Sequence, residues 1–491
     1  MKPVVNKPKD KWYRLATVKV PLALCASGLV IYAGTLAFVR WQTGRFDGHA
    51  FRSLDSREYF DLARNLADHG TFSQSAAQPM KPDTWRTPGY PLFLAAVMKL
   101  AGPSPVALII AQHLLGILNV LLVFRIARAY MSANRAALTA LLFLFEPYHL
   151  FYTNWLMSET LFTTVILLTW LAWQRCVPRI HIGWSLAVGL LSGALILIRP
   201  LAILVPIALA IAPFLRALKT NTPRRKIGSW LTAVAVLVGS FLIVGSWVAR
   251  NRVVAGHWAI SEQGGIVLAY FKATEVILWR EGRTRDRYLE TSLDPAARDQ
   301  PHVVWERIDA GLRERIAKQF PHLSESELST LHWSNLAQGN KTPIDSFEIS
   351  RALGDWAVAE LMKRPLSTFA CCAARCLDNL TFPLGLATHP PSQEGGGSRL
   401  QWAVVGAVYT LLLLAAIAGL LRSRPRPTRQ DRSRFSANHV ALFPVLVLGA
   451  LLLTTTPQVE PRFRVPLIPL MAVVAMLPRR VPDQKGEPNA E

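Results

Sequence analysis

Charged residues, and acidic residues above all, are scarce in this sequence. Asp, Glu, Lys and Arg make up 18% of its 491 residues, against roughly 25% in an average soluble domain. Only 32 residues are acidic while 54 are basic, which leaves a formal net charge of +22. A composition so poor in charge excludes an intrinsically disordered chain, because disorder needs high charge combined with low hydrophobicity.

Cysteine is rare as well, with five in the whole sequence. That number is too small for a small disulfide-rich scaffold, and the spacing matches no zinc-binding pattern. The chain also lacks an internal repeat, a collagen-like glycine period and a soluble nucleotide-binding motif. These absences remove several large classes of protein before any single residue is considered.

Long apolar runs are what the sequence has instead. Hydrophobic residues make up 51% of the chain and the mean hydropathy is +0.25. A soluble protein this basic would suggest a nucleic-acid partner, but it would not carry apolar runs near 20 residues, the length that crosses a bilayer. We therefore expect no nucleic acid and predict an all-α polytopic membrane protein of about ten spans. The expected spans are about Val18–Val39, Val106–Phe124, Ala136–Leu150, Glu159–Trp173, Trp184–Ile198, Leu201–Leu215, Trp230–Val248, Trp402–Leu421, Val440–Leu453 and Val465–Leu477.

Basic residues in the short connections predict the orientation of these spans. Every densely basic connection falls on one side of the membrane, which indicates that both termini are cytoplasmic. The apolar stretch Gly89–Leu100 is too short to span and is predicted to be a juxtamembrane helix at the outer face. The predicted organisation is a cytoplasmic N-terminus (1–17), a catalytic membrane module (18–249) with a first periplasmic loop (41–105), a periplasmic loop domain (250–400), C-terminal membrane helices (401–478) and a cytoplasmic tail (479–491).

The first loop contains the most informative carboxylate. Segment Phe51–His69 has the period of an amphipathic helix, and Asp55 falls in the middle of its apolar stripe, with Tyr59 and Leu62. A carboxylate on a packing face is costly unless it is used or paired. The alternative is that Ser53 caps the helix and Asp55 is a first-turn acid stabilised by the helix dipole. We favour a functional Asp55, because the dipole does not explain its place in the apolar stripe.

Further candidates lie at the expected outer ends of the spans. Two prolines and a glycine follow Arg86 and fix its backbone at membrane height, where an arginine can bind a phosphate through two hydrogen bonds or extend to lipid headgroups. Glu146 ends one predicted span before Pro147, and Glu159 begins the next as either a functional acid or a first-turn acid behind a serine cap.

Arginines also recur at outer helix ends, against the usual inward bias of positive charge. Arg199, Arg250 and Arg462 are examples. Each alone is explained by contact with lipid headgroups. Together they form a set of cations around one or two carboxylates, which suits an anionic substrate carried by a lipid.

At these residues the chain resembles the GT-C superfamily of polytopic glycosyltransferases, in particular its RgtA/B/C/D-like and protein-mannosyltransferase-like branch. The order of the matching segments is more specific than any one of them. The segments are DSREYFDLARNL from Asp55, RTPGYPLFL from Arg86, EP at Glu146, MSETLF ending at Phe162, RP at Arg199, WVARN from Trp247 with ISEQGG after it, and RFRVPLIPL from Arg462.

The resemblance implies an inverting transferase that takes a sugar from a polyprenyl-phosphate-linked donor. In that family the first-loop carboxylate, here Asp55, is the catalytic base, and the acid matching Glu159 helps to position acceptor or sugar, or a metal in some members. The resemblance makes Arg86, Arg250 and Arg462 candidate ligands of the donor phosphate. Tyr90 and Glu146 are further candidate substrate-binding residues.

Asp55 is followed by Ser56, where protein mannosyltransferases carry Asp-Glu, so protein mannosylation is the less favoured activity. We expect a bacterial inner-membrane glycosyltransferase with a periplasmic active site, membrane lipids around it, and a glycan, lipid or protein acceptor. No cofactor is required by the sequence, although a divalent metal is possible. A transporter or flippase of lipid-linked glycans is the alternative, but transporters tend to show internal repeats and broken midplane helices. A glycan-binding scaffold would leave Asp55 and Glu159 without a role.

Overall fold

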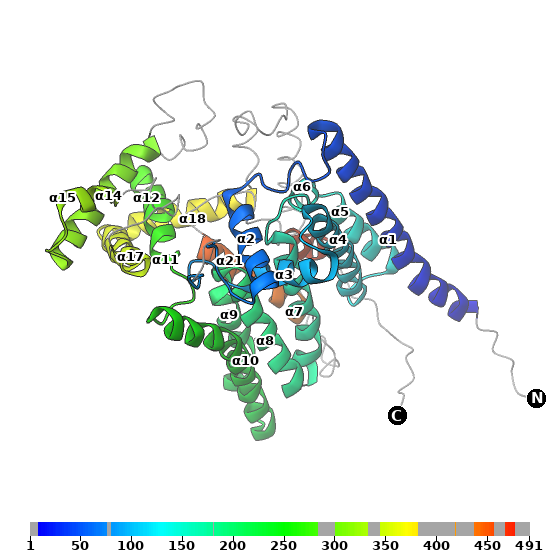
Figure 1. Cartoon of the computed structure of the whole chain (residues 1–491). Helices are drawn as coiled ribbons and strands as arrows, with labels where there is room; N and C mark the ends of the chain where they lie inside the picture. Colours follow the sequence, from blue (N-terminus) through cyan, green and yellow to red (C-terminus); the bar gives the residue numbers. More distant parts are fainter. Residues whose placement is uncertain are drawn as a thin grey trace, which may run out of the picture.

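The computed structural model describes residues 8–75, 80–179, 181–282, 300–331, 344–381, 418, 437–455 and 467–476. Within these ranges every regular element is a helix, so the predicted all-α class is confirmed. Figure 1 shows two groups of helices: a larger one that includes α7, α8 and α10, and a second one of α11, α12, α14, α15 and α17 beside it. The long helix α1 (Pro8–Thr43) runs along the opposite edge of the larger group.

The larger group contains the helices that can cross a membrane. Four stretches are long and apolar enough by length and composition: Val18–Thr43 in α1, α4 (Pro105–Arg128), Pro200–Lys219 across η1 (Pro200–Leu204) and α9 (Val205–Lys219), and α10 (Pro223–Ala255). Large apolar side chains are exposed on their surfaces, including Val30 on α1 and Phe241 on α10. Such exposure is unfavourable in water but normal in lipid, which is as apolar as the side chains themselves. The chain is a multi-pass membrane protein.

Other helices complete this group. They are α2 (Leu54–His69), α3 (Gly89–Ala101), α5 (Ala133–Leu144), α6 (Pro147–Tyr152), α7 (Glu159–Arg179), α8 (Ile182–Ile198), α21 (Ala437–Thr455) and α22 (Ile468–Ala475). Eight of the predicted spans have a helix in the expected place, and the separate helix expected at Gly89–Leu100 is α3.

One predicted span, Ala136–Leu150, is interrupted. Helix α5 ends at Leu144, and the chain begins a new helix at Pro147, because proline has no N–H with which to continue the helix and favours its first turn. The span expected at Trp402–Leu421 lies, apart from residue 418, outside the described residues. The number of spans therefore stays a prediction.

Helices α8 and α10 pack closely, and small residues make this possible. Gly189 on α8 and Gly239 on α10 lie where the two backbones approach, and a Cβ atom at Gly189 would collide with the carbonyl oxygen of Val236. Small residues at helix interfaces are a common way to pack helices in membranes, where the hydrophobic effect does not drive association. This contact fixes the direction of α8, and Arg199 directly follows the C-terminal end of that helix.

The second group of helices has a hydrophobic core of its own. Its buried members come from α11 (Gly264–Ile266), the π-helix η2 (Val267–Ala273), α12 (Thr274–Arg280), α14 (Gln300–Gln319) and α17 (Ser346–Met362), with α15 (Glu325–Ser329) and α18 (Pro365–Thr381) beside them. We call this cluster the second core. Trp85, from the first loop, packs against it, so the two groups of helices meet at the first loop. The domain boundaries inferred from the sequence remain predictions.

The close contact between α8 and α10 gives a test of the fold. Gly189→Ala should lower the melting temperature of the detergent-solubilised protein, because overpacking costs about 1–3 kcal/mol. Gly34→Ala on α1 is the matched control, since a Cβ atom there meets nothing within 4 Å. That control should be neutral or stabilising, because alanine favours a helix over glycine by about 1 kcal/mol. Equal effects of the two substitutions would contradict the packing described here.

Candidate active site

Asp55 lies in the first turn of α2, at the end of the helix that faces the site. Ser53 caps this helix, and its side-chain oxygen accepts a hydrogen bond from the backbone N–H of Asp55 at 3.3 Å. The apolar stripe is present too, because Tyr59 and Leu62 are buried while the side chain of Asp55 keeps 23% of its surface exposed. Both structural features considered in the sequence analysis are therefore present, since Asp55 is a first-turn acid and also lies on the packing face of its helix.

Arg86 is the partner of Asp55. Its Nη2 atom lies 2.5 Å from Asp55 Oδ1, and its Nε atom lies 2.5 Å from Glu58 Oε2. The guanidinium also lies over the ring of Tyr59, 5.2 Å from the ring centroid. Burial lowers the pKa of Arg86, but the carboxylates of Asp55 and Glu58 outweigh it, and the net pKa is well above the ordinary value. Arg86 therefore stays charged and holds two carboxylates one helical turn apart.

The backbone around Arg86 is fixed by Asp83. The Asp83 carboxylate accepts hydrogen bonds from the backbone N–H of Arg86 at 3.0 Å and from the side chain of Gln74 at 2.6 Å. Its backbone carbonyl accepts one from Arg250 Nη1 at 2.6 Å. Arg250 in turn lies over the rings of Trp247 and Phe72. Arg250 thus holds the backbone of the loop that carries Arg86, but its own side chain does not line the cavity.

The glycine after Pro88 explains how this loop reaches α8. A Cβ atom on Gly89 would lie 2.8 Å from the backbone nitrogen of Ile198 and 2.8 Å from the carbonyl oxygen of Leu197. Only glycine allows α3 to begin this close to the end of α8. The contact brings the segment of Arg86 next to Arg199, which follows Ile198.

Glu159 and Arg199 form a buried ion pair at the start of α7. Arg199 Nη1 lies 2.5 Å from Glu159 Oε1, and the Glu159 side chain has no exposed surface. Removing one partner of such a pair leaves an uncompensated buried charge, which is strongly unfavourable. Arg199 reaches the cavity described next, whereas Glu159 lies behind it.

A cavity of about 590 Å³ lies where these segments meet. It is bordered by Asp55, Arg86 and Arg199, and its walls are mainly apolar. The remaining lining residues are Tyr59, Thr87, Met157, Ser158, Ile198, Pro200, Leu201, Ile203, Leu204, Ser261, Gln263, Gly264, Val267, Leu268, Phe271, Lys272, Leu453 and Thr454. The cavity thus combines one carboxylate, three cations and an apolar surface, which is the chemistry that binds a charged head and a hydrocarbon tail.

Lys272 is the cation of this cavity that the sequence did not indicate. It lies on η2, where the i→i+5 hydrogen bonds of a π-helix widen the turn, a feature often found at functional sites. Its ammonium group donates to the carbonyl oxygen of Thr454, at the end of α21. Burial lowers the pKa of Lys272. Among the described residues no carboxylate forms a salt bridge with it, in contrast to Arg86 and Arg199.

Two other candidates from the sequence, Tyr90 and Glu146, lie away from the cavity. Tyr90 is fully buried, donates to Gln112 Oε1 at 2.7 Å and packs edge-on against Tyr59. Glu146 is the N-cap of α6 and accepts backbone hydrogen bonds from Tyr148 at 3.0 Å and His149 at 2.5 Å. Neither lines the cavity. Arg462 lies outside the described residues, so its role stays a prediction.

The sequence analysis also missed Glu58 and the pairing of Arg199. Glu58 follows Asp55 by three residues, a spacing that places both on one side of a helix, and this was the available signal. No local pattern links Arg199 with Glu159, which lie 40 residues apart.

A metal site is not apparent in this arrangement. The described residues contain no group of three or more His, Cys, Asp or Glu side chains that could hold an ion. The carboxylates nearest the cavity are already paired with arginines, so their donor set does not fit a divalent cation without rearrangement.

The comparison with protein families gives one match. Residues 82–247 match the family model described as dolichyl-phosphate-mannose-protein mannosyltransferase. The match begins after Asp55 and includes Arg86, Glu159 and Arg199. It confirms the predicted resemblance to GT-C membrane glycosyltransferases over this part of the chain. No curated protein matches the sequence.

Among solved structures the likeness is distant. The crystal structure of ArnT from Cupriavidus metallidurans bound to undecaprenyl phosphate has 15% sequence identity and a TM-score of 0.39, over 92% of this chain and 77% of that one. The archaeal oligosaccharyltransferase AglB from Archaeoglobus fulgidus, in complex with an inhibitory peptide and a dolichol-phosphate, has 12% identity and a TM-score of 0.44, over 93% and 50%. The arabinosyltransferase EmbB from Mycobacterium smegmatis has 13% identity and a TM-score of 0.35, over 93% and 42%.

The buried pair behind the cavity gives a second test. Arg199→Ala should destabilise the protein by about 3–5 kcal/mol, because it leaves Glu159 buried without its partner. Adding Glu159→Gln to that variant should recover much of the loss, since the uncompensated charge is gone. Thermal unfolding of wild type, both single variants and the double variant measures this. If the double variant is no more stable than Arg199→Ala, the pair does not interact as described.

Proposed function

We propose that this membrane protein is a glycosyltransferase that transfers a sugar, with inversion, from a polyprenyl-phosphate-linked donor to an acceptor at the periplasmic face of a bacterial inner membrane. The observation that carries the proposal is the cavity in which Asp55 meets Arg86, Arg199 and Lys272 between apolar walls. The apolar walls suit a prenyl chain and the three cations suit its phosphate. The matching family is named for a dolichyl-phosphate-linked mannose, a donor of this class.

Asp55 is the catalytic base of the proposed reaction. An acceptor hydroxyl is a weak nucleophile, and a positioned carboxylate activates it by taking its proton as the new glycosidic bond forms. The hydroxyl oxygen attacks the anomeric carbon from the face opposite the phosphate. The bond from that carbon to the phosphate oxygen breaks, and polyprenyl phosphate leaves with the bonding electrons. The anomeric configuration is inverted by this single displacement.

The cations of the cavity stabilise the leaving phosphate. Arg86, Arg199 and Lys272 can offset the negative charge that grows on the phosphate oxygen as the bond breaks. Arg250 supports this step through the loop of Arg86, and Glu159 supports it by orienting Arg199. Arg462 remains a proposed phosphate ligand on the basis of the sequence.

The other proposed residues act from behind the cavity wall. Tyr90 packs on Tyr59, which lines the cavity. Glu146 fixes the start of α6, in the connection that leads to Met157 and Ser158. The distribution of basic residues favours an orientation with both chain termini in the cytoplasm, and in that orientation the site faces the periplasm. The acceptor is a cell-envelope glycan, lipid or protein.

Asp55→Asn tests the proposed chemistry. The amide cannot take the acceptor proton, so turnover with a polyprenyl-phosphate sugar should fall by about 10²–10⁴-fold, the usual contribution of a general base. Binding of the donor should change far less, because the cations are retained. Asp68→Asn is the matched control, since Asp68 lies on the same helix with half of its side chain exposed and, within the described part of the chain, forms a salt bridge with Arg64 alone. Wild-type turnover by Asp55→Asn would refute the assignment of the base.

Lys272 gives a prediction about pH. Because burial lowers its pKa, the free enzyme should lose this positive charge at a lower pH than an ordinary lysine does. The value of kcat/KM for the donor should therefore decline as the pH rises through that lowered pKa. Lys272→Arg keeps its charge and should extend activity to higher pH, whereas Lys272→Ala should be weak throughout. Identical pH profiles for wild type and Lys272→Arg would show that this lysine does not bind the donor.

A further inference from the structure

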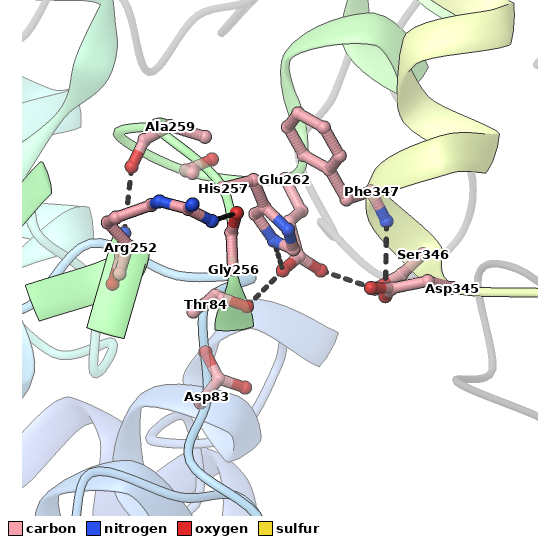
Figure 2. Close-up of polar contacts among 12 residues, drawn as sticks. Asp83, Thr84, Arg252, Gly256, His257, Ala259, Glu262, Asp345, Ser346 and Phe347 are labelled. Carbon is pink, nitrogen blue, oxygen red and sulfur yellow. Dashed lines mark hydrogen bonds and ion pairs between the residues drawn. The ribbon is translucent and has the colours of Figure 1, made fainter. Parts of the chain in front are cut away.

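A buried carboxylate outside the cavity joins three distant parts of the chain. Glu262 lies between α10 and α11, and its side chain is 5% exposed. It accepts hydrogen bonds from the hydroxyls of Thr84 and Ser346 and lies 3.0 Å from His257 Nε2 (Figure 2). A buried carboxylate is costly unless it is well hydrogen-bonded. The proposed chemistry does not use this group.

The partners of Glu262 come from both groups of helices. Ser346 is the first residue of α17 in the second core, and Thr84 belongs to the first loop. The backbone N–H of Glu262 donates to the carbonyl oxygen of Thr84 at 3.1 Å, so Thr84 is held by both backbone and side chain. The ring of His257 stacks on Phe347, with centroids 3.9 Å apart and planes at 9°.

The segment that carries Glu262 is itself held to α10. Asn251 Nδ2 donates to the carbonyl oxygen of Ala259 at 2.8 Å, and Trp247 Nε1 donates to that of Ile260 at 2.9 Å. Beyond Glu262 the chain reaches Gln263 and Gly264, which line the cavity. Glu262 is thus fixed relative to the membrane helices and lies one residue from the cavity wall.

Thr84 connects this cluster to Arg86. The residue before Thr84 is Asp83, whose carboxylate accepts the backbone N–H of Arg86. The residue after it is Trp85, which packs against the second core. A shift of Thr84 must therefore shift the backbone of Arg86, and with it the guanidinium that holds Asp55 and Glu58. Figure 2 shows Thr84 beside the Glu262 carboxylate, with Asp83 next to Thr84 and farther from Glu262.

We propose that Glu262 is a positioning residue: by tying the first loop to α17 it sets the place of Arg86 in the cavity, so that the second core controls the geometry of the active site. The proposal rests on the proposed function of that site for its kinetic consequences. Its structural content, the fixing of Arg86 by Glu262 through Thr84, is independent of the reaction catalysed.

A double-mutant cycle between Glu262 and Arg86 tests the proposal. Glu262→Ala should lower kcat by about 10–100-fold, since a displacement of about 1 Å can cost up to 10²-fold. In an Arg86→Gln background the same substitution should cost less than about 3-fold, because residues that act through one another are not additive. Glu262→Gln should recover most of the activity, because its amide can accept from Thr84 and donate to the Ser346 oxygen. Independent, multiplicative effects of Glu262→Ala and Arg86→Gln would overturn the proposal.

Hydrogen–deuterium exchange supplies a readout that does not need turnover. Glu262→Ala should speed exchange of the backbone amides of residues 82–88, and Glu262→Gln should not. Asp309→Asn is the matched control, because Asp309 is buried in the second core, where it accepts from Tyr270, away from the first loop. That control should leave the exchange of residues 82–88 unchanged.

The two measurements separate the possible failures. Unchanged exchange of residues 82–88 in Glu262→Ala overturns the positioning role, whatever the reaction is. Faster exchange in a protein whose wild type transfers no sugar from polyprenyl-phosphate donors supports the positioning role and refutes the proposed function instead. If Arg86→Gln does not fold, Arg86→Lys replaces it in the cycle. Lysine keeps the positive charge but lacks the planar guanidinium that contacts Asp55 and Glu58 through two nitrogen atoms.

Discussion

The arrangement of the site depends on one buried cation shared by two carboxylates. Arg86 contacts both Asp55 and Glu58, and a guanidinium so buried is tolerable only because its charge is compensated on both sides. The surrounding structure holds these side chains in position. The cap of α2 presents the carboxylates, Asp83 fixes the backbone of Arg86, and Gly89 brings the loop against α8. The same logic applies at Glu159, whose buried charge is matched by Arg199.

In this strongly basic chain, carboxylates are paired with the arginines of the cavity. The positive charges of Arg86 and Arg199 are each compensated by carboxylates, so these two arginines do not add uncompensated positive charge to the cavity. Lys272 differs, because its contact is a carbonyl oxygen at the end of α21. In the proposed reaction the anionic head of the donor meets Arg86 and Arg199 in positions that protein carboxylates already fix, which is the preorganisation that favours charge stabilisation.

Local features of the fold could be predicted from the sequence, whereas contacts between distant segments could not. The 3.6-residue period identified α2 and placed Asp55 beside Tyr59, and the Pro-Gly pair after Arg86 indicated a fixed turn, because these signals are local. Pro147 indicated the break at Glu146, although the apolar run itself continues to Leu150. The pairing of Arg199 with Glu159 and the arrival of Lys272 depend on tertiary packing, which no local pattern encodes. Arg250 was recognised as unusual, yet its contact with the Asp83 backbone could only be seen once the loop was folded.

The walls of the cavity come from both ends of the chain. Asp55 lies near the N-terminal end of the described residues, and Leu453 and Thr454 on α21 close the same space. Contacts of such large sequence separation form late, because closing long loops is entropically costly. During synthesis the cavity is therefore incomplete until α21 has been made and has packed in place, and a chain truncated before α21 keeps Asp55, Arg86, Arg199 and Lys272 but lacks one wall of the cavity.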